Sequence, residues 1–211
     1  MNTKFSFLSA GVGLALIFTG CTKDPISNLT QEESRIYITN HDSSTNFSSF
    51  KTFSISDSVT YVNNGRSSRN LTSTDRGFID AAIAQMKVVG YVQVNKQTNP
   101  DVGINISRIT NTSTGVIVYD NYYNGYGSYY DPFYWGGGFG GFNYFMPYGY
   151  ATYSIREGAL SIDLLNLKDA KATNQIKIAW TGLIRGSGIF SSDPNSQVKT
   201  LFDQSPYLKT N

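Results

Sequence analysis

The sequence predicts an α+β fold: an antiparallel sheet with two helices packed on one face and a long glycine- and aromatic-rich insertion loop. Three observations support this class. Short segments with the two-residue alternation of half-buried strands outnumber helical ones. One long segment has the three- and four-residue spacing of an amphipathic helix. The gaps between the later strands are of hairpin length, which favours antiparallel neighbours.

The chain divides into three regions by composition. Residues 1–20 have the layout of a signal peptide, and residues 21–46 are polar, rich in Ser, Thr, Asn and Gln. We expect residues 21–46 to form a tether that contributes one short strand at Arg35–Thr39. Residues 47–211 are enough for one domain and few for two, so we expect a single domain there.

The first strands of this domain are predicted by alternation. Phe53 and Ile55 alternate with polar neighbours, which is the pattern of a half-buried strand. A second strand at Val59–Val62 is placed to pair with it. Residues 63–73 (NNGRSSRNLTS) are polar except for Gly65 and Leu71 and are predicted to be a loop.

The clearest helix is predicted over Asp75–Val89. Ser73 or Thr74 can cap its first amides, and Gly90 suits the left-handed position after its end. Its apolar residues recur every three or four positions and form one face: Phe78, Ile79, Ala82, Ile83, Met86 and Val89. We expect that face to pack on the sheet.

The remaining elements are mainly strands. They are predicted at Tyr91–Val94, Val102–Ile106, Val116–Tyr119, Thr152–Arg156, Ala159–Leu167 and Ile176–Ile184. The second and third of these suggest an antiparallel hairpin, because only a short turn separates them. Asp193-Pro194 is typical of a cap and first-turn proline, so a short final helix begins there and stops before Pro206.

The N-terminus, MNTKFSFLSAGVGLALIFTGC, indicates export. Lys4 precedes an uncharged apolar run that is too short to span a bilayer, as in a cleaved signal peptide. Phe18-Thr19-Gly20-Cys21 resembles the bacterial lipobox, although lipoboxes usually carry Leu where this chain has Phe18. The resemblance implies cleavage before Cys21, a diacylglycerol on its sulfur and an N-acyl chain such as palmitate. The alternative is an ordinary signal peptide that happens to precede a cysteine.

A lipidated Cys21 would make the membrane the first partner of the protein, because several acyl chains together anchor it stably. Cys21 is the only cysteine, so no intramolecular disulfide can form. Thr22 stands where Asp would resemble an inner-membrane retention signal, so the resemblance implies the outer membrane, with the periplasmic or surface side left open. Lys and Arg total 17 against 15 Asp and Glu, without a basic cluster, so we expect no nucleic-acid partner.

Six short motifs follow one another in a defined order between residues 46 and 207. They are Phe47 to Phe53 (FSSFKTF), the helix from Ile79 to Gly90-Tyr91, Pro100-Asp101, Gly158 to Leu164 (GALSIDL), Ile178 to Gly182 (IAWTG), and Leu201-Phe202 before Pro206. Together they resemble the DUF4136 lipoproteins of the bacterial envelope. The chain departs from that family at Ser205, where an aromatic residue is common. The family name denotes unknown function, so the resemblance implies location and fold and no catalytic residue.

Candidate chemistry is limited by the residue inventory. With His41 as the sole histidine and Cys21 assigned to lipid, no zinc set of Cys and His can be assembled, and we expect no metal and no cofactor. His41 would have to be the base of any Ser-His-Asp set, but it is interpreted as a solvated surface residue. Asp163 is the best-placed acid for a glycan-acting hydrolase with paired carboxylates, although a residue alternating with apolar neighbours more often faces solvent.

The segment 122–150 is the most unusual in composition. Of its 29 residues, 14 are aromatic and 8 are glycine, with Asp131 as the single charge. Long loops of this kind are typically functional or disordered. If the loop binds an envelope protein or glycan, the expected contacts are Tyr129, Tyr130, Tyr134, Trp135 and Phe142.

The sequence therefore favours a non-enzymatic outer-membrane lipoprotein with a binding or structural role. A glycan-acting hydrolase that uses Asp and Glu carboxylates is the alternative. Asp57-Ser58-Val59 also resembles the acceptor triplet of a bacterial O-glycosylation system, which makes Ser58 a candidate modification site.

Overall fold

The structure is a computed structural model that describes residues 29–63, 66–109, 116–118, 143–145, 152–154, 158–173 and 175–210. The strands are β1 (Ile36–His41), β2 (Thr52–Ile55), β3 (Val59–Asn63), β4 (Arg66–Asn70), β5 (Val92–Gln93), β6 (Val102–Ile109), β7 (Val116–Val118), β8 (Asn143–Phe145), β9 (Thr152–Ser154), β10 (Ala159–Asn166) and β11 (Gln175–Arg185). The helices are α1 (Ser73–Val88), α4 (Ala170–Thr173) and α5 (Pro194–Asp203), with 3₁₀ turns at Phe47–Ser49, Lys96–Thr98, Ile189–Ser191 and Pro206–Leu208.

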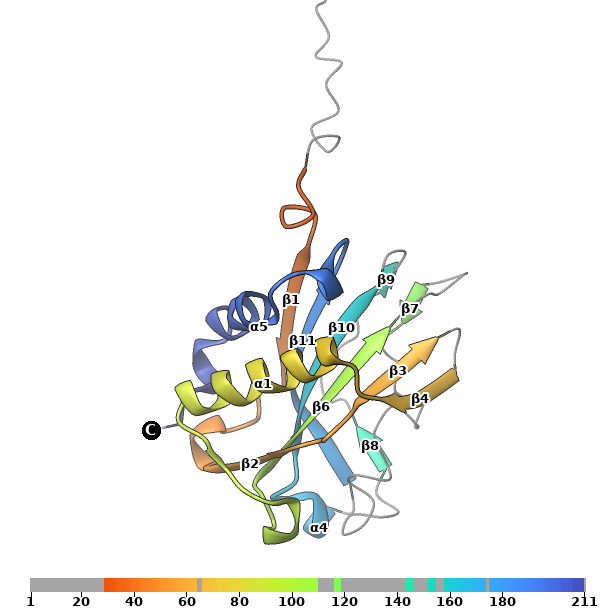
Figure 1. The fold of residues 1–211 in the computed structure, drawn as a ribbon. Coiled ribbons are helices and arrows are strands. Elements are labelled where there is room, and N and C mark those ends of the chain that lie inside the picture. The colour runs from red at the N-terminus through yellow and green to blue at the C-terminus, as the bar shows by residue number, and fades with distance from the viewer. Residues whose placement is uncertain are drawn as a thin grey trace, which may run out of the picture.

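The α+β class is confirmed. Among the described residues a nine-stranded sheet has the main order β1-β11-β10-β6-β2-β5, and its centre, β1-β11-β10-β6, is antiparallel. Helices α1 and α5 lie side by side across one face of this sheet (Figure 1). Apolar side chains from both helices and from the strands beneath them form one core cluster.

The sheet is mixed, whereas the sequence predicted an antiparallel one. β2 and β3 both pair in parallel with β6, β2 through Phe53↔Val102 and β3 through Thr60↔Ser107. Helix α1 lies between β3 and β6 in the chain, and a helical crossover returns the chain to the end from which it started. The prediction of antiparallel pairing is confirmed for β1 with β11, for β10 with β11 and β6, and for β3 with β4, and is wrong for the pairs that β2 and β3 form with β6.

Two further pairings differ from expectation. β4 lies inside the stretch 63–73 that was predicted to be a loop, and it pairs antiparallel with β3. Its residues are polar on both faces, so an edge strand there leaves no apolar alternation to detect. β7 pairs with β9 in a separate two-stranded sheet and not with β6, because β10 already occupies one edge of β6 and β2 and β3 the other.

Helix α1 begins at Ser73, two residues ahead of its expected start, and its N-cap lies one residue ahead of the expected caps. Thr72 is the N-cap: its hydroxyl accepts a bond from the Asp75 amide at 3.2 Å, while the Asp75 carboxylate accepts one from the Thr72 amide at 2.8 Å. This reciprocal capping box satisfies two amides that the helix itself leaves unpaired. Gly90 follows the helix at φ +101°, the left-handed conformation that was expected of it.

Trp180 is the centre of the core between α5 and the sheet. Its indole Nε1 donates to Ser205 Oγ at 2.9 Å, and its ring lies 5.4 Å from that of Phe202. Gly182 stands beside it on β11, where a Cβ atom would lie 2.6 Å from Trp180 Cη2. A residue without a side chain is therefore required for the tryptophan to lie flat on the strand.

The folded unit begins ahead of the expected boundary at residue 47. β1, predicted as a short strand at Arg35–Thr39, pairs with β11 from Ile36↔Arg185 to His41↔Trp180. Residues 36–41 are therefore part of the sheet and not of a free tether. The strand was predicted but assigned to the tether because of its polar neighbours, which an edge strand tolerates on its solvent side.

We predict that Tyr91→Phe leaves stability at neutral pH unchanged or raises it by up to about 1 kcal/mol, because the buried Tyr91 hydroxyl has no hydrogen-bond partner among the described residues. Burial, assisted by the charge of Asp101, raises the pKa of Tyr91 well above its ordinary value. The folded state keeps Tyr91 neutral at a pH at which the unfolded chain ionises it. The free energy of unfolding is therefore unaffected by Tyr91 below about pH 10 and falls as the pH rises further. Urea unfolding between pH 7 and 11 should show a weaker alkaline loss in the variant, and an equal loss would contradict the prediction.

Candidate functional site

The most distinctive polar site in the described structure lies where the chain enters the domain. The Arg35 side chain is 1% exposed, and its guanidinium faces the connection between β11 and α5. Nε donates to the Ser187 carbonyl at 3.2 Å, and Nη2 donates to the Gly188 carbonyl at 3.2 Å and to Ser192 Oγ. Arg35 therefore joins the N-terminal segment to a loop more than 150 residues away along the chain.

The ion pair of Arg35 is weaker than these bonds. Glu32 Oε1 lies 3.8 Å from Nη1, and the Glu32 side chain is 75% exposed to solvent. Nη1 has no hydrogen-bond acceptor among the described residues. Because a solvent-screened contact of this length contributes little, the guanidinium is held mainly by backbone carbonyls.

A tight turn precedes Arg35. The Thr30 amide and hydroxyl both donate to the Glu33 carboxylate at 2.9 Å, and the Glu33 amide donates back to Thr30 Oγ1 at 3.2 Å. The Thr30 amide, followed by its hydroxyl, holds the pKa of Glu33 below its ordinary value. The Ser34 amide closes the turn on the Thr30 carbonyl at 3.0 Å. The segment is thus locally ordered before it reaches the sheet.

Two glycines allow this segment to lie against the body of the domain. A Cβ on Gly186 would lie 2.8 Å from the Ser34 carbonyl oxygen, and Gly186 has φ +126°. A Cβ on Gly188, at φ +66°, would collide with the Gln31 side-chain amide. A larger residue at position 186 would prevent this backbone approach, whereas one at position 188 would displace the Gln31 side chain.

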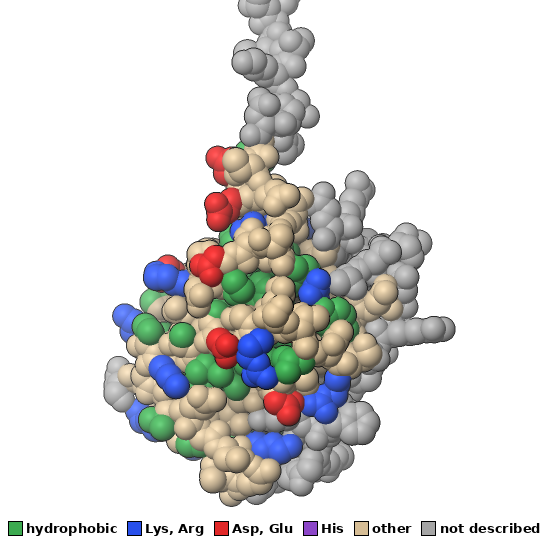
Figure 2. Space-filling view, in the orientation of Figure 1, with side chains coloured by type: hydrophobic (Ala, Val, Ile, Leu, Met, Phe, Trp, Pro, Cys, Tyr) green, Lys and Arg blue, Asp and Glu red, His purple; other side chains and the backbone are tan. Residues whose placement is uncertain are grey.

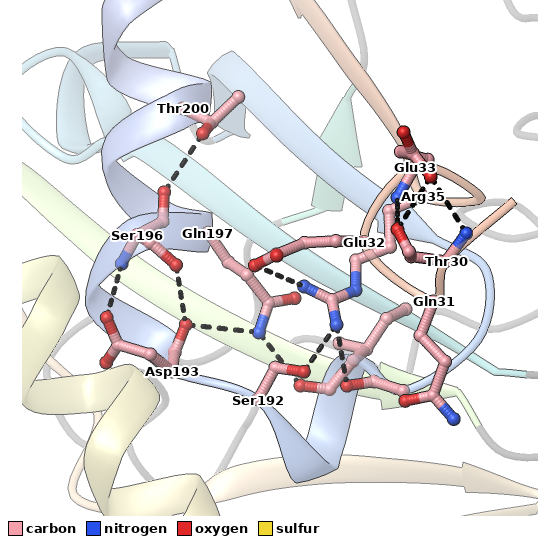
Figure 3. A network of polar contacts seen from close by, with 12 residues as sticks. Thr30, Gln31, Glu32, Glu33, Arg35, Ser192, Asp193, Ser196, Gln197 and Thr200 are labelled. Carbon is pink, nitrogen blue, oxygen red and sulfur yellow. Dashed lines mark hydrogen bonds and ion pairs between the residues drawn. The ribbon is translucent and has the colours of Figure 1, made fainter.

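The first turn of α5 borders the same site (Figure 3). Asp193 caps the helix by accepting bonds from the Asn195 and Ser196 amides, which hold the pKa of Asp193 below its ordinary value. Gln197 is fully buried, and its Nε2 donates to the carbonyls of Ile189 and Asp193. Arg35 and Gln197 therefore fix the two ends of the same connection.

A second polar group lies on the sheet face opposite the helices. Asn105, Asp163 and Thr181 occupy paired positions on β6, β10 and β11 and are each at most 2% exposed. Asp163 Oδ1 accepts bonds from Thr181 Oγ1 at 3.0 Å and Ser161 Oγ at 3.1 Å. Asp163 was expected to face solvent, and the structure shows it buried. Its carboxylate is engaged by hydroxyl donors, as a structural polar group should be.

The two most buried carboxylates do not form a pair. Asp75 belongs to α1 on the helix-bearing face, where Arg108 Nη1 lies 3.4 Å from it, and Asp163 points from the other face. The Arg108 guanidinium also stacks on Phe190, 3.7 Å from the ring centroid. The sheet separates the two acids, so they cannot act together on one glycosidic bond.

His41, interpreted from the sequence as a solvated residue, is partly buried. Its ring stacks on Tyr207 at 4.0 Å between centroids, and Phe47 lies 6.2 Å away. Its backbone amide donates to Asn40 Oδ1 at 2.9 Å, and His41 pairs with Trp180 at the end of the β1–β11 ladder. The sole histidine therefore packs the end of β1 against the C-terminal turn.

Ser58 is the one predicted site residue that the structure describes. Its Oγ accepts bonds from Arg69 Nε at 2.9 Å and Nη2 at 2.7 Å, and Arg69 also pairs with Asp57 at 2.8 Å. Modification of Ser58 stays a prediction. Cys21 and the five aromatic residues, Tyr129, Tyr130, Tyr134, Trp135 and Phe142, lie outside the described residues, as does most of 122–150. Within that segment, β8 pairs in parallel with β11 through Asn143↔Gln175.

The described residues hold no group of three or more His, Cys, Asp or Glu side chains placed to bind a metal ion. None of the described helices is both long enough and apolar enough to cross a membrane. Charged side chains of both signs are interspersed over the helix-bearing face (Figure 2). The sequence analysis did not identify Arg35 as a buried residue. Two signals were available: Thr30-x-x-Glu33, which has the spacing of a capping box, and the closely spaced Gly186 and Gly188.

Comparison with known proteins agrees with this fold. The model of the domain of unknown function DUF4136 matches residues 38–207. The crystal structure of a DUF4136 family protein from Bacteroides thetaiotaomicron is 24% identical, covers 84% of this chain and 99% of its own, and superposes with a TM-score of 0.65. No curated protein matches this chain. At this identity the structural likeness concerns the fold.

We predict that Arg35→Met lowers the free energy of unfolding by about 2 kcal/mol or more, because it leaves the Ser187 and Gly188 carbonyls without their charged donor. Glu32→Gln is the matched control, since it breaks the ion pair from its exposed side and should cost less than about 0.5 kcal/mol. Urea denaturation measures both variants. Equal losses would show that the ion pair, and not the carbonyl bonds, holds the guanidinium.

Proposed function

The chain belongs to the DUF4136 family, and we propose that it is a non-enzymatic outer-membrane lipoprotein, anchored through Cys21, with a binding or structural role in the envelope. The observation that carries the proposal is the segment ahead of the family match. It joins an apolar signal-like run to a lone cysteine preceded by small residues.

The geometry of the N-terminal segment supports an anchored protein. The described chain begins at Leu29 and projects beyond one end of the sheet before it enters β1 (Figure 1). Cys21 precedes Leu29 by eight residues, so the proposed anchor would join the domain at that end of the sheet. The buried Arg35 contacts hold that segment to the body of the domain.

The non-enzymatic part rests on how two buried acids, Asp75 and Asp163, and the half-buried Asp101 are used. Asp75 caps α1, Asp101 accepts the amides of Lys51 and Thr52, and Asp163 accepts hydroxyl bonds within the sheet. Each of these carboxylates is committed to a structural bond. A general acid or base needs a carboxyl group that is free to exchange a proton with a substrate.

The binding part of the proposal concerns an envelope protein or glycan. The aromatic residues of 122–150 supply it, since 14 rings with a single charge suit stacking on sugar faces or an apolar protein surface. The contacts proposed are those at Tyr129, Tyr130, Tyr134, Trp135 and Phe142. Deleting residues 133–142, which leaves β8 in place, should abolish retention of the protein on cell-wall material or envelope proteins.

We predict that Cys21→Ser releases the protein from membranes. Intact-mass measurement of the native protein should show a chain that starts at residue 21 and carries acyl groups, whereas the serine variant should retain residues 1–20 or appear soluble. Sucrose-gradient fractionation should place the wild type with the outer membrane. Ser58→Ala, which leaves the cysteine intact, is the control for fractionation. An unmodified cysteine in the mature wild type would overturn the proposal.

A further inference from the structure

We infer that Thr30–Arg35 is a strap docked on the domain, and that it holds the domain close to the leaflet with the loop of Gly186–Ser192 facing the lipid. The inference rests on the proposed lipidation of Cys21. It concerns the orientation and distance of the domain, which lipidation by itself does not determine.

The length of free chain sets the distance. If residues 22–46 were a free tether, the domain could lie up to about 85 Å from the lipidated residue, at about 3.4 Å for each extended residue. Among the described residues the contacts to the β11–α5 connection begin at Gln31, whose side chain lies against Gly188, so at most Thr22–Thr30 separate the lipid from the domain. A stretch of that length reaches about 30 Å at most. Docking of the strap and pairing of β1 together thus reduce the reach about threefold.

The strap is held in two stages. The outer stage is the Thr30–Glu33 turn and the Arg35 guanidinium, which is 1% exposed and bonded to two carbonyls of the β11–α5 connection. The inner stage is β1, whose six residues pair with β11. Losing the outer stage would lengthen the tether by about 20 Å, at about 3.4 Å for each of six residues, without opening the sheet.

The position of the strap sets the orientation. Arg35 enters beside the loop of Gly186–Ser192 (Figure 3), and the lack of a side chain at Gly186 lets the backbone of Ser34 and Arg35 lie against this loop. The 3₁₀ turn Lys96–Thr98 lies at the opposite end of the molecule (Figure 1). A short tether that leaves the domain at one end brings that end to the leaflet and turns the other away.

Proteolysis tests the docking. In lipidated full-length protein on phosphatidylethanolamine and phosphatidylglycerol vesicles, a glutamate-specific protease should cut after Glu32 and Glu33 slowly, because it needs an extended substrate. Arg35→Met should be cut about tenfold faster or more, the effect of removing bonds to a buried charged donor. Thr30→Val, which alters only the exposed turn, should show a smaller increase.

Lys199→Met is the matched control, because it breaks the exposed Lys199–Asp203 pair on α5 and leaves the strap untouched. Its cleavage rate should equal that of the wild type. A melting curve for each variant separates opening of the strap from unfolding of the domain. Wild-type cleavage as fast as that of a free peptide of residues 22–36 would overturn the inference, as would equal rates in the wild type and both strap variants.

Energy transfer tests the orientation. Because lipid would occupy the sole native thiol, Ser191→Cys and Thr98→Cys each provide one labelling site, at the two ends of the domain, and both residues are exposed. A donor at position 191 should transfer to acceptor-labelled lipid headgroups more strongly than one at position 98, and Arg35→Met should reduce the difference. Equal transfer in the wild type would overturn the inference.

Intact-mass measurement of the same samples separates the two proposals. An unmodified Cys21 means that the lipoprotein proposal fails and that the strap has no leaflet to orient. Acylated Cys21 with equal transfer from both positions means that lipidation holds and the strap inference is wrong. Acylated Cys21 with unequal transfer supports both.

Discussion

A buried guanidinium determines how this chain enters its domain. Removing a charged group from water is costly, and the cost must be offset by hydrogen bonds of good geometry. The exposed Glu32 lies too far away to do so, whereas two backbone carbonyls and a hydroxyl from one connection lie within bonding distance of Arg35. Because those acceptors belong to the chain between β11 and α5, Arg35 fixes the N-terminal segment and the approach to α5 together.

Pairing also constrains the arrangement of the sheet. β6 is paired along both edges, with β10 on one and the β2 and β3 segments on the other, and this sharing sends β7 to a separate pairing with β9. One face of the central strands is apolar and covered by α1 and α5. The other carries the buried polar row of Asn105, Asp163 and Thr181, in which Thr181 donates to Asp163, so the two faces of one strand have different chemistry. Strand alternation predicts such a division, but not whether the polar face is exposed.

The elements that sequence predicts well are those whose signal is local. Leu160, Ile162 and Leu164 alternate along β10, and the capped apolar face of α1 identifies that helix within two residues of its observed start. The failures depend on distant partners. Arg35 is one arginine in a polar stretch until the chain places it beside Ser187, and Asp163 resembles an exposed acid until Thr181 is brought next to it. β4 was not predicted for another reason. A strand that is polar on both faces has no apolar alternation to detect.

If Cys21 is anchored as proposed, the length of the tether limits which partners the domain can meet. The effective concentration of a tethered group rises steeply as its linker shortens, provided that the linker still spans the distance. A domain docked through Thr30–Arg35 would therefore meet components of its own leaflet more often than a domain on a long tether. Partners of the end beside Gly186–Ser192 would then lie within that layer, whereas those of the opposite end, near Lys96–Thr98, would extend toward it from the aqueous side. In that arrangement the hydrogen bonds of Arg35 help to decide which molecules each end of the domain can contact.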